Sequence, residues 1–354
     1  MEKVLEAFDN KEMSRRTFVK NSLLVAGALT LAPSIGAVEE KTKVMTVTGE
    51  ITAEKMGFTL THEHVMSIFG GAPAKVAQYD EEKLFARVIP YLKMLKTFGV
   101  ETICDCTAAY FGRRADLLKK ISEESGVQIL TNTGYYGAAN DRYVPDHVHQ
   151  ETAEQIAVRW IDEWKNGIDG TGIRPGFIKI GVDEGLKSDV DKKLIRAAGL
   201  THLETGLTIA SHTSRSTDAA VEQVTILTEM GVDPSAWIWV HAHNVEDVAD
   251  LQPIANAGAW ISLDGIRKET LDKHINALRY LRRFGVLHRV LLSHDGNSFR
   301  YGDRPFKAYD AIVHEFIPLM KKANFRDEEI TRFLVENPRE AFGVKVRRIV
   351  VEEE

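Results

Sequence analysis

The sequence predicts a (β/α)8 TIM barrel of the α/β class with a short N-terminal β lead, and two observations support this fold class. Apolar runs of strand length alternate with amphipathic stretches of helix length, and the alternation occurs eight times. Eight such units need roughly 250 residues, which a chain of 354 residues supplies with room for extensions. The predicted strands are 58–64, 102–107, 128–136, 177–182, 207–213, 237–243, 260–266 and 290–295.

The second observation concerns the turn after the first strand. An open, doubly wound parallel sheet is the alternative architecture for the same alternation of strands and helices. Such a sheet is expected to carry a glycine-rich phosphate-binding turn directly after its first strand. No such turn follows 58–64, so the closed barrel is preferred.

The remaining elements follow from periodicity and capping signals. The polar segment 44–51 has strand character and predicts a small hairpin or a lid before the barrel. Helical patterns cover 81–97, 152–166, 190–204 and 217–230. Ser188 and Ser216 precede the last two patterns and are expected to cap those helices.

The composition limits the kind of partner. The chain carries 45 basic and 51 acidic residues, a formal net charge of −6, without a basic block. This balance argues against a nucleic-acid ligand and favours a small-molecule substrate. No later stretch holds 18 consecutive apolar residues, so no membrane span is expected in the mature protein. The two cysteines, Cys104 and Cys106, are expected to be core thiols.

Residues 1–37 predict a twin-arginine export signal. Arg15 and Arg16 precede an apolar run over 23–35, and Gly36-Ala37 offers a small-residue cleavage site. A frayed N-terminal helix is the alternative explanation. The signal predicts a periplasmic location and leaves 38–354 as a single barrel domain.

Ligand-type side chains stand at the predicted strand ends. Barrel enzymes build their sites at the carboxyl ends of strands, and side chains at i and i+2 of a strand leave the same face. Each residue alone has a structural explanation, such as a core histidine or a helix cap. Together they predict a metal site. The six residues are His62, His64, Lys179, His212, His241 and Asp295.

In this order of residues the chain resembles the phosphotriesterase-like family of the metal-dependent amidohydrolase superfamily. The resemblance runs from Thr61-His62-Glu63-His64 to Val335-Glu336-Asn337-Pro338-Arg339, essentially the whole chain after the signal. It implies two metal ions that share a bridging ligand. The implied ligands are His62, His64 and Asp295 for the buried ion, His212 and His241 for the more exposed ion, and an N-carboxylated Lys179 for both.

The implied chemistry is hydrolysis by a hydroxide that bridges the two metal ions. Imidazole and carboxylate ligands suit Zn²⁺ first, with Mn²⁺ and Co²⁺ as alternatives. A carboxylated Lys179 supplies a bridging anion on a long stem and removes the cost of burying an ammonium group. Two metal ions lower the pKa of a shared water, and Asp295 is the expected general base.

Two strand ends supply candidate substrate contacts. The resemblance matches Tyr136 to an aromatic residue that lines the family's substrate pocket, and a core role is the alternative. The predicted sixth strand runs through His243, which has the same parity as His241. We expect His241 to bind the metal and His243 to lie beside it or contact the substrate.

The seventh strand departs from the family pattern. Asp264 matches the family's aspartate, but Gly265 stands where well-known members have histidine or arginine. Arg267 and His243 are therefore the candidates to replace the proton relay that a side chain at this position would provide.

The loop after the eighth strand is basic and carries Arg300, Tyr301, Arg304 and Lys307. Guanidinium groups beside a metal site favour an anionic substrate, with Arg300 as the expected contact. A solvated turn balanced by Asp303 and Asp310 is the alternative.

Three functions are compatible with these residues. The first is a zinc-dependent hydrolase that acts on a lactone or on a carboxylic ester of a polar or anionic compound. The second is a hydrolase of phosphoesters, including organophosphate triesters. The third is an exported protein that binds a metal or solute without turnover. The resemblance also allows a homodimer, because helical faces of family barrels often pair.

Overall fold

The computed structural model describes residues 41–349 apart from 187, 214 and 303. The predicted export signal over 1–37 lies outside the described residues and stays a prediction. Within the described ranges, none of the helices combines the length and the apolar character that a membrane crossing requires.

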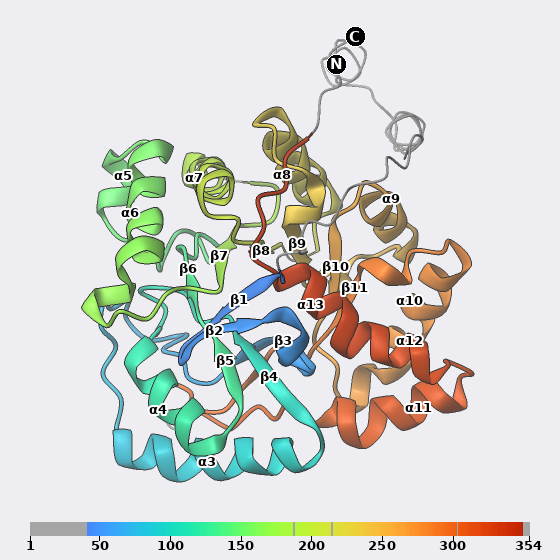
Figure 1. The fold of residues 1–354 in the computed structure, drawn as a ribbon. Helices are drawn as coiled ribbons and strands as arrows, with labels where there is room; N and C mark the ends of the chain where they lie inside the picture. Colours follow the sequence, from blue (N-terminus) through green and yellow to red (C-terminus); the bar gives the residue numbers. More distant parts are fainter. Residues whose placement is uncertain (1–40, 187, 214, 303, 350–354) are drawn as a thin grey trace, which may run out of the picture.

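The core is a closed barrel of parallel strands, as predicted (Figure 1). Hydrogen bonds group the strands into two sheets, β11-β10-β9-β8-β7-β6 and β12-β3-β4-β5. These sheets join because the predicted third and eighth strands are each interrupted, so that one half pairs with each sheet. The strands are β3 (Phe58–His64), β4 (Val100–Asp105), β5 (Gln128–Leu130), β6 (Asn132–Thr133), β7 (Phe177–Gly181), β8 (Ile209–His212), β9 (Trp237–Val240), β10 (Trp260–Leu263), β11 (Val290–Leu292) and β12 (Gly296–Asn297).

The interruption of the eighth strand determines the position of Asp295, one of the predicted ligand residues. β11 pairs with β10, whereas β12 pairs with β3 through Gly296 and Glu63. Asp295 lies between the two halves with φ 53°, in the left-handed region that few non-glycine residues adopt. The predicted strand 290–295 is therefore wrong in its second half. Asp295 leaves the ladder, and its side chain lies beside His62 and His64 at the end of β3.

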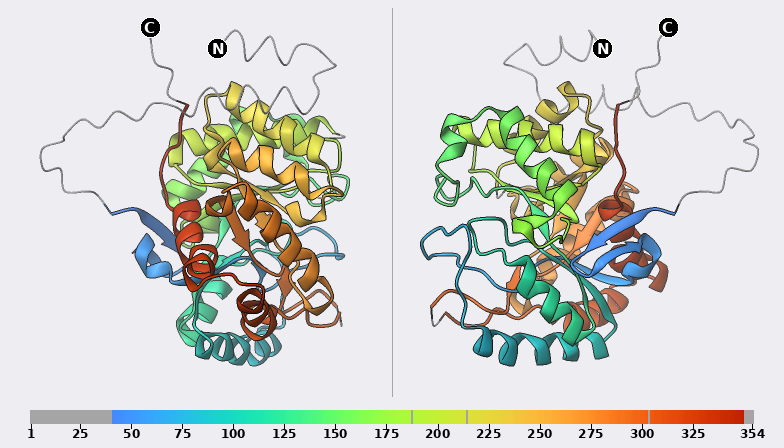
Figure 2. Two further views of the ribbon diagram at one scale, coloured as in Figure 1. Left: turned by 90° about the vertical axis from the view of Figure 1, so that its right-hand side faces the viewer. Right: turned by 60° about the vertical axis from the view of Figure 1, so that its left-hand side comes forward.

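Helices surround the barrel on its outside (Figure 2). The predicted caps are confirmed, because the hydroxyls of Ser188 and Ser216 accept backbone N–H groups of α7 and α8, and Thr152 caps α6 in the same way. The helices are α3 (Glu81–Thr97), α4 (Ala115–Ser125), α5 (His147–Gln150), α6 (Ala153–Asn166), α7 (Asp189–Thr205), α8 (Thr217–Glu229), α9 (Leu251–Asn256), α10 (Leu271–Arg283), α11 (Ile317–Lys322), α12 (Asp327–Thr331) and α13 (Asn337–Phe342).

The N-terminal lead is the predicted hairpin, made of β1 (Lys43–Thr46) and β2 (Gly49–Thr52). It packs beside β5 and α13 (Figure 1). Val44 belongs to one buried cluster with residues of the early parts of the strands, such as Phe177 and Trp260. The hairpin therefore covers the amino-terminal end of the barrel and is not a lid over the site. Cys104 and Cys106 are buried free thiols, as predicted.

One glycine is required where β6 approaches β7. Gly134 follows β6 with φ +119°, and a Cβ added to it would lie 2.2 Å from the carbonyl oxygen of Lys179. Both the backbone angle and the contact exclude a side chain. We expect Gly134→Ala to lower the free energy of unfolding by about 2 to 5 kcal/mol, measured by urea denaturation.

A matched control is Gly49→Ala. Gly49 has a similar backbone angle, φ +125°, but no atom lies within 4 Å of an added Cβ. This variant should lose only about 1 to 2 kcal/mol of unfolding free energy. Equal losses in the two variants would show that contact with the Lys179 strand does not constrain position 134.

Candidate metal centre

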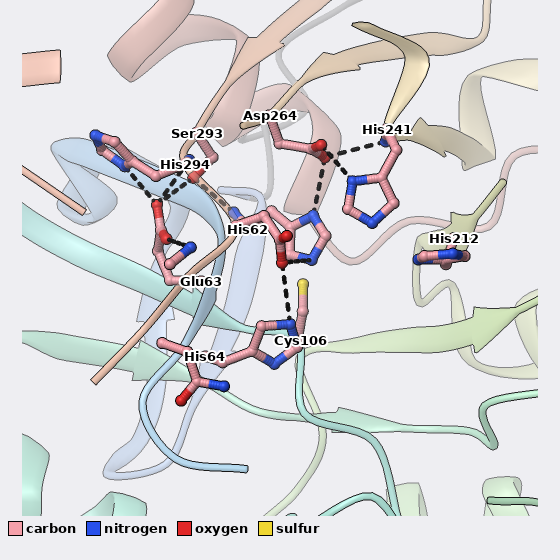
Figure 3. A network of polar contacts seen from close by, with 12 residues as sticks. His62, Glu63, His64, Cys106, His212, His241, Asp264, Ser293 and His294 are labelled. Atoms are coloured by element: carbon pink, nitrogen blue, oxygen red, sulfur yellow. Dashed lines mark hydrogen bonds and ion pairs between the residues drawn. The ribbon is translucent and has the colours of Figure 1, made fainter. Parts of the chain in front are cut away.

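The six predicted ligand residues come from β3, β7, β8 and the segments after β9 and β11, at the same end of the barrel. The ring centroids of His62 and His64 are 5.5 Å apart, and those of His62 and His241 are 5.0 Å apart. His212 lies 4.4 Å from His241, centroid to centroid. Figure 3 shows these four imidazoles around one space, with Asp264 behind them. The fold thus brings together residues that are up to 233 positions apart in the sequence, from His62 to Asp295.

Asp264, directly after β10, holds two of these histidines. Its Oδ2 accepts a hydrogen bond from His62 Nδ1 at 2.9 Å, and its Oδ1 accepts one from His241 Nδ1 at 2.6 Å. The His241 backbone N–H and the Ser262 hydroxyl also donate to Oδ2. Because an ionised carboxylate only accepts, both Nδ1 atoms carry the proton, which leaves each Nε2 as the free ligand atom.

The charge balance around Asp264 favours a cation. Burial alone would raise the pKa of Asp264, but the charges of His241 and His62 and their hydrogen bonds hold it well below its ordinary value. Burial would lower the pKa of His241, but Asp264 raises it above its ordinary value. This buried anion therefore stabilises positive charge on its histidines, whether a proton or a metal ion supplies it.

The orientation of His64 is fixed separately. Its Nδ1 lies 2.8 Å from the hydroxyl of Thr107, which itself donates to the Met66 carbonyl. Since that hydroxyl proton is already used, His64 Nδ1 is the donor and Nε2 is the free atom. Burial lowers the pKa of His64 to about 4, so the ring is neutral near pH 7, as a metal ligand requires.

Asp295 completes one group of ligand atoms. Its Oδ1 lies 3.6 Å from His62 Nε2 and 3.4 Å from His64 Nε2. Burial would raise the pKa of Asp295, but the contact with His64 and the charges of His62, His241 and Lys307 hold it well below its ordinary value. His62, His64 and Asp295 are thus spaced as three donors to one ion.

Glu63 fixes the segment that carries Asp295. It is fully buried on the opposite face of β3, and its Oε1 accepts from the Ser293 hydroxyl at 2.7 Å and from His294 Nδ1 at 2.7 Å. Its Oε2 accepts from the Gly296 backbone at 2.7 Å (Figure 3). These hydrogen bonds fix the chain on both sides of Asp295 and stabilise its uncommon backbone angle.

Lys179 and His212 lie on the neighbouring strands β7 and β8. Lys179 is buried, and burial lowers the pKa of its amine, which favours the neutral form. Its Nζ lies 3.1 Å from the Ile180 carbonyl and 5.6 Å from the ring centre of Tyr136. Burial and the charge of His241 lower the pKa of His212 well below its ordinary value, so this ring is neutral as well.

The donor set fits divalent metal ions. The free nitrogens of His62, His64 and His241 face inward, and two carboxylates lie beside them, as transition metals require. The atoms of His62, His241 and Asp264 are also close enough together to suggest a second group. However, both oxygens of Asp264 already accept hydrogen bonds, so this residue positions the ligands rather than binding the ion.

The structure places Tyr136 beside the predicted ligands. Its hydroxyl lies 3.3 Å from His212 Nδ1, and its ring stacks on Phe111 at 4.9 Å between centroids. Phe111 in turn lies 5.7 Å from the His64 ring. Tyr136 therefore belongs both to an aromatic wall and to the edge of the site.

The prediction that His243 lies on the sixth strand, with the same parity as His241, is wrong. β9 ends at Val240, and His241 adopts a left-handed conformation with φ 67°, so the strand parity of 237–243 does not apply. His243 lies in the 3-10 turn η4 (Ala242–Asn244). Its Nδ1 is nonetheless 3.1 Å from Asp264 Oδ1. A Cβ added at Gly265 would lie 2.6 Å from His243 Nε2, so this imidazole fills the space in front of the glycine.

The two predicted arginines are directed elsewhere. Arg267 is largely exposed and its Nε lies 3.6 Å from Glu269 on the same turn. Arg300 donates to the Pro305 carbonyl at 3.3 Å, and its backbone bridges to Ser67 at the end of the β3 loop. Arg300 therefore lies at the mouth of the site, whereas no contact links Arg267 to the six predicted ligands.

Sequence reasoning missed the work of three residues. Asp264 was matched to the family without a role, and Glu63 was named only as part of the motif that contains His62 and His64. Lys307 was counted in a basic loop, whereas its Nζ lies 2.8 Å from Asp295 Oδ2. The signal for Glu63 and Asp264 was their charge within apolar strands, since buried carboxylates need several donors.

Comparison with known proteins agrees with this geometry. Residues 42–342 match the model of the phosphotriesterase family. The chain is 32% identical to the phosphotriesterase homology protein of Escherichia coli, over 81% of this chain and 98% of that protein. It is 30% identical to an aryldialkylphosphatase of Saccharolobus solfataricus, over 83% and 97%. A mutant phosphotriesterase-like lactonase of Deinococcus radiodurans superposes with a TM-score of 0.77 at 27% identity, over 85% and 100%.

The role of Asp264 can be tested by Asp264→Asn. An amide offers one acceptor oxygen, so it cannot hold both His62 and His241 by their Nδ1 atoms. We expect the affinity for Zn²⁺ to fall about 10- to 100-fold, measured by titrating metal-free protein against a chelator. Asp272→Asn, an exposed change in the first turn of α10, is the control. An unchanged affinity in a folded Asp264→Asn variant would contradict the positioning role.

Proposed function

Since the chain belongs to the phosphotriesterase family, we propose that it hydrolyses a lactone or carboxylic ester of a polar or anionic compound with the help of two divalent metal ions. The family match supports the assignment as a hydrolase. The kind of bond that is cleaved and the identity of the metal ions are proposed here.

One observation supports the metal-dependent mechanism more than any other. Asp264 and Thr107 occupy Nδ1 of three histidines, and the free Nε2 atoms of two of them, His62 and His64, lie 3.6 Å and 3.4 Å from Asp295 Oδ1. Such an arrangement has a high cost in the absence of a cation, because it gathers lone pairs of nitrogen around a carboxylate.

The ligand roles are proposed residue by residue. His62, His64 and Asp295 would hold one ion and His212 and His241 the other. Lys179 would lie between them as an N-carboxylated lysine, for which its neutral, buried amine is suited. Zn²⁺ suits this donor set first, with Mn²⁺ and Co²⁺ as alternatives. When bound, the ions would lower the pKa of water and polarise the bond to be cleaved.

Asp295 would act as general base. The attacking water forms a bond from its oxygen to the carbonyl carbon and gives a proton to Asp295. The carbon–oxygen bond to the leaving alkoxide then breaks, and the alkoxide receives a proton. Asp295 lies within the ligand group and is less than one third exposed, so it meets the water without being open to bulk solvent.

Phosphoester hydrolysis is the second candidate. The relative from Saccharolobus solfataricus is named an aryldialkylphosphatase, whereas the structural neighbour from Deinococcus radiodurans is named a lactonase. Both reactions use the same base and the same metal ligands. We favour the lactone or ester because a solved structure at 27% identity is titled as organophosphate hydrolysis activity engineered from a weak promiscuous lactonase template, which makes the lactone the starting activity of that protein. A protein that binds without turnover is not supported by the match to a family of hydrolases.

The base can be tested by Asp295→Asn in zinc-loaded protein. Because the amide cannot accept the proton of the attacking water, kcat/KM should fall about 10²- to 10⁴-fold for every hydrolysed member of a panel of lactones, carboxylic esters and phosphoesters. Release of acid is followed with a pH indicator. Asp272→Asn should retain activity. Tight binding of these compounds by wild-type protein with no turnover would contradict the proposal and favour a binding function.

Carboxylation of Lys179 can be observed directly. Metal-free protein is reconstituted with Zn²⁺ and ¹³C-labelled bicarbonate, and a carbamate carbonyl resonance is expected by ¹³C NMR. Lys179→Gln should lack this resonance because it has no amine to react with carbon dioxide. Full zinc uptake by wild-type protein in carbon-dioxide-free buffer, with no resonance, would contradict the modification.

A further inference from the structure

Lys307 is held at a fixed place relative to Asp295. Its backbone N–H donates to the Asn297 carbonyl at 2.9 Å, and its carbonyl accepts from the Asn297 N–H at 2.7 Å. Asn297 ends β12, two residues after Asp295. The loop between them therefore returns Lys307 to the carboxyl end of the barrel instead of leaving it in solvent.

The two oxygens of Asp295 face different partners. Oδ1 faces the Nε2 atoms of His62 and His64, whereas Oδ2 lies 2.8 Å from Lys307 Nζ. The Lys307 side chain is 40% exposed and that of Asp295 is 29% exposed. The ammonium group thus lies at the boundary between the ligand atoms and the solvent, where a substrate must enter.

Three guanidinium groups extend this positive charge along the mouth. Arg142 donates to the Gly71 carbonyl at 2.8 Å, Arg300 to Pro305 at 3.3 Å, and Arg304 to Phe69 at 2.9 Å. None of the three forms an ion pair with a carboxylate among the residues that the structure describes. We call Lys307, Arg142, Arg300 and Arg304 the basic rim. Among the described residues, Asp295 is the carboxylate that forms an ion pair with a member of this rim.

We propose that Lys307 determines specificity by binding an anionic oxygen group of the substrate next to the bond that is cleaved. The group is a carboxylate, sulfonate or phosphate. This inference rests on the proposed function and names its substrate class. On binding, the anion replaces Asp295 Oδ2 as the partner of Lys307, whose ammonium has three donors and a flexible stem.

The exchange distinguishes two kinds of substrate. An anionic substrate takes over the ammonium of Lys307, whereas a neutral substrate leaves its ion pair with Asp295 intact.

The test compares two substrates with the same scissile bond, such as the monomethyl and dimethyl esters of one short dicarboxylic acid. Zinc-loaded wild type, Lys307→Met and Lys307→Arg are assayed on both. We expect Lys307→Met to lower the ratio of kcat/KM for the anionic over the neutral ester at least about tenfold, and Lys307→Arg to restore most of it. An equal loss on both esters would overturn the proposal, because a residue that only orients Asp295 acts on both alike.

A second measurement does not depend on turnover. Binding of the free dicarboxylate to zinc-loaded protein is measured by calorimetry, with Lys119→Met, an exposed change on α4, as the matched control. Kd should rise at least about tenfold in Lys307→Met and stay unchanged in Lys119→Met. Lys307-dependent binding without turnover of any ester would refute the proposed function but support this inference. Turnover with an unchanged substrate ratio and equal Kd values would refute the inference alone.

Discussion

The arrangement of the site depends on the burial of Asp264. A carboxylate removed from water is stable only when donors surround it, and here two imidazoles, a backbone N–H and a hydroxyl serve that purpose. Removing one partner of such a buried charge costs about 3–5 kcal/mol. The same interaction turns the Nε2 atoms of His62 and His241 inward, so the fold and the ligand geometry are stabilised together.

A second buried carboxylate, Glu63, positions Asp295, the proposed base. Glu63 closes the barrel between β3 and β12 and grips the segment around Asp295 through Ser293, His294 and Gly296. Parallel barrels need a continuous ladder, yet a base at the mouth must leave it. The interrupted eighth strand satisfies both requirements, because β11 and β12 each keep their neighbour while Asp295 turns between them.

The sequence was sufficient to predict the features that depend on local patterns of residues. Alternation of apolar runs gave the barrel, and the strand ends His62, His64 and His212 were located because those strands continue to the residues expected. The sequence did not predict where strand pairing stops, because that depends on contacts between distant parts of the chain. β9 ends before His241 and the third strand breaks at Thr131, and neither event leaves a periodicity signal. The contact of Lys307 with Asp295 depends on how a loop returns to β12, which no spacing reveals.

Gly265 stands where well-known members of the family have histidine or arginine, and the structure around it accounts for this difference. Gly265 lacks a side chain, but the volume in front of it is not empty, since His243 Nε2 would lie 2.6 Å from any Cβ placed there. The glycine and the histidine are therefore one coupled feature, contributed by the segments that follow β9 and β10. His243 also lies 3.1 Å from Asp264 Oδ1, so the imidazole meets the buried carboxylate and not Asp295 in any described contact. Within the proposed hydrolysis, the ammonium of Lys307, 2.8 Å from Oδ2, has no lone pair with which to accept a proton from Asp295, so the leaving alkoxide is the acceptor that the proposed reaction itself supplies.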